Sequence, residues 1–116
     1  MFEESYERLE RKRRALMKKM AKIGPVIMAS PCHLLVRCGN PICKCKKDPH
    51  ARHPALHLSW SEKESHSTQY VPVGLKEEVL TWIENYWLLK EYIKEISLIS
   101  RQMVRIYVKS KKRKKI

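Results

Sequence analysis

Apolar residues recur at alternating intervals of four and three positions along two long stretches of the chain. The first stretch begins at Phe2 and ends at Ile23, with one polar interruption at Arg13, and the pair Gly24-Pro25 follows it. This spacing places the apolar side chains on one face of an α-helix, and a Gly-Pro pair is typical of a helix end. The pattern therefore predicts a helix over residues 2–23.

The second stretch has the same spacing and runs from Leu75 to Tyr107, with Ser100 as its polar member. No proline or glycine occurs between residues 75 and 116. The pattern therefore predicts one helix over residues 74–109, about 50 Å long at the usual rise per residue. Residues 110–116 are so densely basic that we expect a flexible tail, because like charges repel one another.

Three short runs between the two helices have the composition of β-strands. They read HLLVR, ALHLSW and TQYVPV, at residues 33–37, 55–60 and 68–73. The polar segment 61–67 predicts a turn between the second and third strands. Pro72 cannot donate a backbone hydrogen bond, so it confines the third strand to an edge of the sheet or marks its end.

Length and charge narrow the possible functions. A chain of 116 residues is one domain's worth, and it has a formal net charge of +13. From Arg101 onward there are eight basic residues and no acid. No run approaches the ~20 apolar residues that span a membrane, and the N-terminal segment lacks the apolar core of a secretory signal. We therefore expect a cytoplasmic protein in which disulfides do not form.

Three of the four cysteines lie in the segment CGNPICKCKKDPHARH, residues 38–53. Thiolates are good ligands for Zn²⁺, and both the metal and nearby cationic side chains favour the deprotonated form. A tetrahedral site needs a fourth ligand. The segment therefore predicts a structural zinc held by Cys38, Cys43, Cys45 and His53. His50, then Cys32, are the next choices for the fourth ligand, and His57 is a further option.

Other interpretations of this cluster compete with structural zinc. An iron–sulfur cluster has the necessary number of cysteines, but the spacing C-x4-C-x-C is unlike the common patterns. A redox dithiol normally uses C-x-x-C, which is absent from the chain. Loop thiols without metal are the simplest alternative. A catalytic zinc would need a general base in a cleft, and Asp48 is the only acid between residues 11 and 61.

These elements predict one domain over residues 1–116, mainly α with a small β and zinc head. Two long heptad helices pack as an antiparallel coiled coil, joined by a short-stranded zinc-knuckle insert at 26–73. Ile23 then lies near Leu75 and Phe2 near Ile96, so the second helix overshoots the first by about three turns. Its apolar residues there need cover, which predicts a homodimer through the C-terminal half of this helix. The alternative is that this end frays or folds back.

The chain also resembles a family of small uncharacterised prokaryotic proteins, some of which are described as transposase-associated. The resemblance rests on Cys38-Gly39, Pro41, Cys43 and Cys45, and on the later motifs Leu58-Ser59, Val71-Pro72 and Ile83–Tyr86. It covers most of the chain, from about Leu9 to Met103. The family pattern has His-Gly-Pro and an aromatic residue where this chain has RHPA at 52–55. The resemblance implies the fold, the zinc ligands and a link to mobile elements, but no activity.

Basic side chains along a surface bind nucleic-acid phosphates by releasing counterions. The candidates are Arg37, Lys44, Lys46, Lys47, Arg52, Arg101, Arg105, Lys109, Lys111, Lys112, Arg113, Lys114 and Lys115. Trp60 and Tyr70 could stack on bases, or they could pack in the core of the head.

The sequence contains no Gly-rich phosphate loop, paired acidic motif or Ser/His/Asp-like set, so we expect no enzyme activity. It predicts a nucleic-acid-binding accessory protein with structural zinc. The alternative is a coiled-coil interaction or assembly subunit whose basic surface serves solubility or an acidic protein partner.

Overall fold

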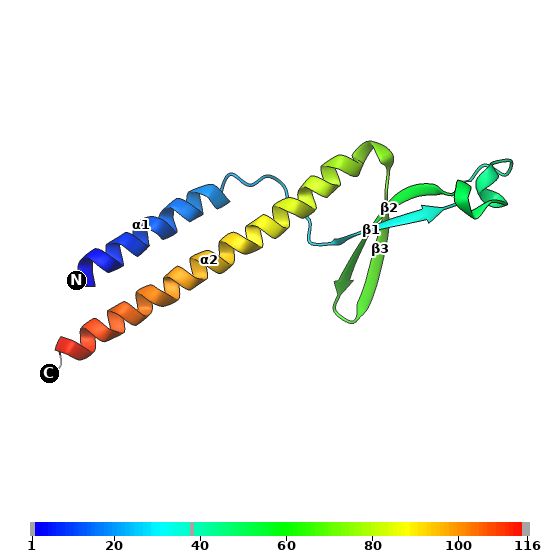
Figure 1. Ribbon diagram of the computed structural model, residues 1–116. Coiled ribbons are helices and arrows are strands. Elements are labelled where there is room, and N and C mark those ends of the chain that lie inside the picture. The colour runs from blue at the N-terminus through cyan, green and yellow to red at the C-terminus, as the bar shows by residue number, and fades with distance from the viewer. Residues whose placement is uncertain (1, 38, 115–116) are drawn as a thin grey trace. The chain divides into compact units, whose positions relative to one another are not determined.

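The computed structural model describes residues 2–37 and 39–114. The elements in chain order are α1 (Phe2–Met20), β1 (Ser30–Val36), η1 (Lys44–Lys46), η2 (Pro49–Ala51), β2 (His53–Glu62), β3 (Ser65–Val71), η3 (Val73–Leu75) and α2 (Lys76–Lys114) (Figure 1). The chain forms two compact units. The sheet unit comprises residues 25–86, and the helical unit comprises the residues up to Gly24 and from Trp87 onward. Helix α2 therefore contributes to both units.

The three strands form one antiparallel sheet in the order β1-β2-β3, so β1 and β3 are edge strands. Pro72 directly follows β3, and the prediction that it marks an edge strand or a strand end is confirmed on both counts. The turn predicted over residues 61–67 is much shorter in the structure, because Glu62 pairs with Ser65. Lys63 makes this tight turn possible by adopting a left-handed backbone conformation, with φ of 51°.

One face of the sheet carries the apolar core of the sheet unit. Leu56 and Leu58 of β2 alternate with polar neighbours and lie on the same face as Val71 of β3. These side chains are buried together with Val79 and Ile83 from the first turns of α2, at exposures of 6% or less. The apolar residues that alternate along the strands and those that recur with helical spacing along α2 thus pack together in a single apolar layer. We call this the inner face of the sheet.

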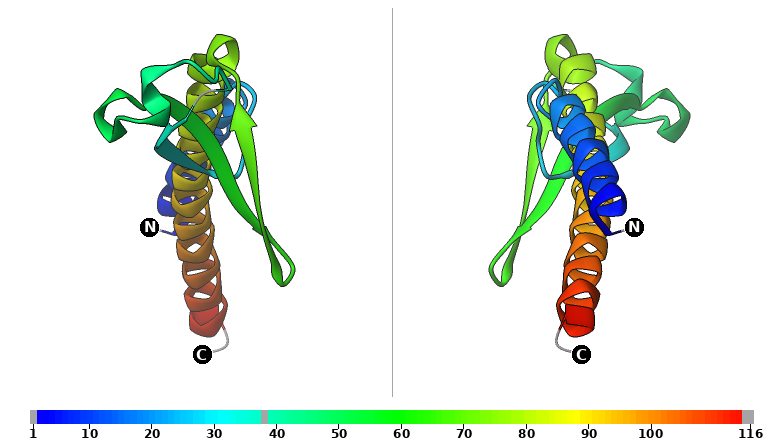
Figure 2. Two further views of the ribbon diagram at one scale, coloured as in Figure 1. Left: turned by 90° about the vertical axis from the view of Figure 1, so that its right-hand side faces the viewer. Right: turned by 90° about the vertical axis from the view of Figure 1, so that its left-hand side faces the viewer.

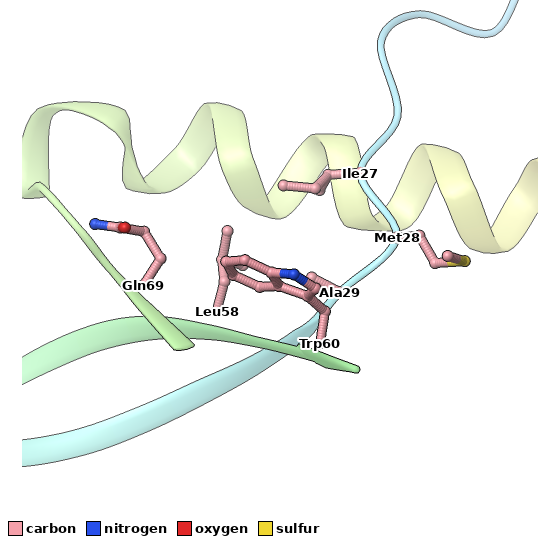
Figure 3. A pocket seen from close by; sticks show the side chains of 6 residues that line it. All are labelled: Ile27, Met28, Ala29, Leu58, Trp60 and Gln69. Carbon is pink, nitrogen blue, oxygen red and sulfur yellow. The ribbon is translucent and has the colours of Figure 1, made fainter. Parts of the chain in front are cut away.

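The segment after Gly24 also lies along α2. The backbone N–H of Ile27 donates to the carbonyl of Trp82 at 3.2 Å, and Asn85 Nδ2 donates to the carbonyl of Pro25 at 2.9 Å. A cavity of about 280 Å³ remains between this segment and the inner face, lined by Ile27, Met28, Ala29, Leu58, Trp60 and Gln69 (Figure 3). Trp60 packs against the core beside it.

In the helical unit, α1 lies antiparallel to the C-terminal part of α2 (Figures 1 and 2). Ile99 and Met103 of α2 are buried there, at 4% and 3% exposure. The polar interruptions of the two heptad patterns meet, because Arg13 Nη1 donates to Ser100 Oγ at 3.0 Å in a partly buried position. The polar members of the two heptad patterns are therefore in contact within the helical unit.

The predicted fold class was wrong. The chain has two helices of unequal length and a three-stranded antiparallel sheet, and the described residues contain no group of three or more His, Cys, Asp or Glu side chains that could hold a metal. A continuous coiled coil does not form, because α2 uses its first turns to cover the sheet. Heptad members Ile93 and Tyr107 remain 52% and 48% exposed.

The predicted alignment of the two helices also differs from the structure. Arg13 meets Ser100, whereas an alignment of Ile23 with Leu75 would place Arg13 much earlier on α2. The reason is that residues 25–27 contact α2 at Trp82 and Asn85. Helix α1 therefore pairs with residues of α2 that are C-terminal to these contacts. Ile99 and Met103, which we expected to need cover from a second copy, are buried within one chain.

Element boundaries shift by a few residues from the predictions. α1 ends at Met20, and single turns closed by the N–H groups of Lys22 and Ile23 lead to Gly24. α2 continues to Lys114, beyond the predicted end at 109, so most of the expected flexible tail is helical. No helix in the described part of the chain is long and apolar enough to cross a membrane.

Candidate metal centre

The segment between β1 and β2 is wound into consecutive tight turns. Asn40 starts the first turn, because its side chain accepts the N–H of Ile42 at 3.1 Å and its carbonyl accepts the N–H of Cys43. After η1, Asp48 starts the last turn by accepting the N–H of His50 at 2.9 Å, with Pro49 at the first position of η2. Asn and Asp favour such turns because their short side chains bond the nearby backbone. These turns reverse the chain within a few residues, so that β2 can pair with β1.

This folding brings Cys43 and His53 together. Cys43 Sγ lies 3.2 Å from His53 Nε2, although ten positions separate the two residues. Cys43 immediately precedes η1, and His53 is the first residue of β2, where it pairs with Val36 at the end of β1. A thiol and an imidazole nitrogen at this separation can both reach one tetrahedral metal ion, since Zn–S and Zn–N bonds are about 2.3 and 2.0 Å long.

The structure describes only some of the other residues that we predicted as zinc ligands. Cys38 and the side chain of Cys45 lie outside the described residues, although the backbone of Cys45 is part of η1. Cys32 pairs with His57 and lies four residues before Val36 on β1, about 13 Å along the strand. The exposed His50 lies in η2. The contact with Cys43 favours His53 among the candidates for the fourth ligand.

Basic residues are near this pair in the sequence. Lys44 and Lys46 of η1 and the following Lys47 are exposed, as is Arg37 directly after β1. Arg52 precedes His53, and its Nε is buried with no hydrogen-bond acceptor among the residues that the structure describes. An unpaired N–H donor on a cation is costly when buried, and a thiolate is an acceptor that would relieve this cost.

The second group of basic candidates follows α2 in the helical unit. Arg101, Arg105, Lys109 and Lys111 are exposed, and Lys111 Nζ lies 5.2 Å from the centre of the Tyr107 ring. Arg101 also donates to Ser97 Oγ at 3.2 Å. Lys112, Arg113 and Lys114 belong to the helix, but their side chains lie outside the description, as does Lys115 entirely.

A polar cluster that sequence reasoning missed lies on the second face of the sheet, which we call the outer face. His57 and Tyr70 are cross-strand neighbours there, with ring centroids 5.6 Å apart and an interplanar angle of 86°. His66 lies between two hydroxyls, with Nε2 2.6 Å from Ser59 Oγ and Nδ1 3.2 Å from Ser61 Oγ. The alternation of polar and apolar residues in HLSWS was the available signal. Of the two proposed stacking aromatics, Tyr70 lies on the outer face and Trp60 on the inner face.

A family model described as a domain of unknown function (DUF6788) matches residues 6–81. These residues include most of α1, the whole sheet and the loop that carries Cys43 and His53. No curated protein and no solved structure matches the chain.

Proposed function

The chain belongs to the family described as a domain of unknown function (DUF6788), and we propose that it is a small nucleic-acid-binding accessory protein with a structural zinc ion. The observation that carries the proposal is the contact of Cys43 with His53 in a loop that also displays exposed lysines. The role proposed is binding rather than catalysis.

The zinc site would combine Cys43 and His53 with the two further cysteines of the same segment, Cys38 and Cys45. Support comes from the 3.2 Å contact and from the donor set itself, since thiolate and imidazole are the usual ligands of structural zinc. The loop has little apolar material with which to hold its shape, and Ile42 is 89% exposed. A metal ion would therefore supply the stability that packing does not. The same thiols fit a reducing, cytoplasmic location.

Nucleic-acid binding is supported by the charge and its placement. The formal net charge is +13, and the loop lysines and the α2 bases are exposed in their separate units. A zinc ion would fix the loop and so present Lys44, Lys46 and Lys47 as a group. Phosphate contacts of this kind release counterions and give an affinity that falls steeply with salt.

A mobility-shift experiment across a salt series tests this proposal. We expect binding to DNA or RNA at about 50 mM salt and a steep fall in affinity toward about 200 mM. Replacing Lys44, Lys46 and Lys47 together with glutamine should weaken binding and reduce the slope of log K against log salt by roughly two to three, because each lost phosphate contact contributes about 0.7–0.9.

The matched control replaces three other lysines with glutamine: Lys63, Lys76 and Lys94. They lie within residues 58–100, a stretch with seven glutamates and four lysines, so the same loss of charge should leave the slope nearly unchanged. Equal effects of the two triple variants would show that the loop lysines act only through the net charge of the protein, and not as a specific phosphate-binding site. Absence of binding at low salt would exclude the nucleic-acid role.

An assembly role is the alternative, and one observation favours it. Ile93, Val104 and Val108 are 52%, 62% and 44% exposed, and their spacing places them on one side of α2. Exposed apolar side chains on a shared helix face are typical of a protein contact. A second copy of the chain covering this side would give the predicted homodimer.

Sedimentation velocity tests the assembly role. If a second copy covers this side, the wild-type protein sediments as a dimer and Val104→Asp as a monomer, because burying an unpaired carboxylate is costly. Gln102→Asp adds the same charge at an exposed position and should leave the dimer intact. A monomeric wild type at all concentrations would remove this alternative in its homodimeric form.

A further inference from the structure

We propose that the outer face of the sheet binds the bases of single-stranded nucleic acid. The inference rests on the proposed function and deepens it, because it assigns base contacts to one surface and phosphate contacts to another. On the inner face, α2 and residues 27–29 cover the apolar core, whereas Ser30, Thr68 and Tyr70 on the outer face are exposed.

The register of the sheet builds this surface from three strands. Cys32, His57 and Tyr70 form one cross-strand row, and Ser30, Ser59 and Thr68 form the next. Directly opposite residues of antiparallel strands point to the same side, so all six lie on the outer face. The surface therefore has an aromatic and imidazole row beside a row of hydroxyls.

Tyr70 is positioned for stacking. It is 44% exposed, and its ring meets the ring of His57 edge to face at an angle of 86°. The edge-to-face contact restrains the tyrosine ring without stacking another ring on it. Bases of any identity can stack on such a ring, which is why aromatic side chains on open sheets suit single strands.

The neighbouring hydroxyls supply polar contacts of the kind that bases and sugars need. His66 is within hydrogen-bond distance of both Ser59 and Ser61, so one imidazole orients two hydroxyl groups. Each hydroxyl can donate or accept, which suits the mixed donors and acceptors of base edges. This side of the hairpin contrasts with the inner face, where the equivalent positions of β2 are Leu58 and Trp60.

Charge complementarity identifies the occupant. His53 begins the same outer face, because it lies four residues before His57 on β2. The loop with Lys44, Lys46 and Lys47 is held to that end of the sheet by the contact of Cys43 with His53. A single nucleic-acid strand that crosses the outer face could thus place its phosphates on the basic loop and its bases on Tyr70. A duplex hides the faces of its bases, so it could use only the loop.

The test compares three labelled probes of matched length: a single strand, the same strand with its bases removed, and a duplex. We expect the wild-type protein to bind the single strand about tenfold more tightly than the abasic strand, because one stacked base contributes that much. Tyr70→Leu should abolish this preference and leave duplex affinity unchanged. Tyr70→Phe keeps the ring and should keep the preference.

Trp87→Leu is the matched control, since Trp87 is an aromatic residue of α2 with 52% exposure. If Tyr70→Leu fails to fold by circular dichroism, His57→Asn removes the neighbouring ring and is used instead. The outer-face site is overturned if Trp87→Leu loses the preference equally, or if neither Tyr70→Leu nor His57→Asn loses it. Binding through the basic residues stands in both cases. Failure of every probe to bind the wild type overturns both proposals.

Discussion

Replacing Cys43 with serine is expected to abolish zinc binding and to lower the melting temperature of the protein. The thiol of Cys43 contacts His53, and serine is a far poorer zinc ligand. Structural zinc contributes about 10–16 kcal/mol of apparent binding free energy in small peptides, so its loss should dominate the stability of this loop. Zinc is measured per chain by elemental analysis, and melting is followed with and without a chelator.

Two variants serve as controls for this experiment. Cys32→Ser changes a thiol about 13 Å from Val36 along β1 and should retain zinc. His50→Gln should also retain it, whereas His53→Gln should not. If His53→Gln retains zinc, His53 is not the fourth ligand and another residue has that role. A wild-type protein with less than about half an equivalent of zinc and no response to chelator would remove the site altogether.

Replacing Ile83 with alanine is expected to destabilise the protein by about 2–5 kcal/mol. Ile83 is 1% exposed and lies in the layer between α2 and the inner face, so truncation leaves a cavity beside Leu56 and Val71. A domain of this size has a total stability of roughly 5–15 kcal/mol, so the loss is a large part of it. Urea denaturation monitored by circular dichroism measures the change.

Leu88→Ala is the matched control for Ile83→Ala. Leu88 belongs to the same helix but is 47% exposed, so removal of a similar number of methylene groups should change the unfolding free energy by much less. Equal destabilisation by the two variants would show that helix formation, rather than packing on the sheet, is the quantity being changed.

Much of the secondary structure was predictable from the sequence because its signals are local. The 4,3 spacing identified both helices, and the Gly24-Pro25 pair and Pro72 marked the ends of α1 and β3. The three strands were found, but each was assigned too few residues at its N-terminal end. Ser65 and His66 are polar and fall in the predicted turn, yet they continue β3, because they pair with Glu62 and Ser61 of β2.

The tertiary arrangement was harder to predict because the heptad pattern does not reveal its partner. The apolar residues of α2 serve two surfaces, with Val79 and Ile83 covering the sheet and Ile99 and Met103 buried in the helical unit. Both sets have helical spacing, so the sequence alone favoured one continuous coiled coil.

The candidate site was partly accessible from the sequence. Cys43 and His53 could be selected from residue type and spacing, and the structure places them in contact. The outer-face cluster could not be selected, because Ser59, Ser61 and His66 have no motif in common and meet only through strand register. Contacts created by pairing are invisible until the register is known.

The contact of Arg13 with Ser100 favours one alignment of the two helices over others. A heptad repeat is nearly degenerate, because sliding one helix by seven residues again places apolar side chains opposite one another. A slide that places Ile93 opposite Arg13 would remove the Ser100 acceptor, with a cost of roughly 0.5–1.5 kcal/mol for the lost hydrogen bond. One arginine and one serine thus favour the observed alignment over neighbouring alignments that the apolar residues alone would also permit.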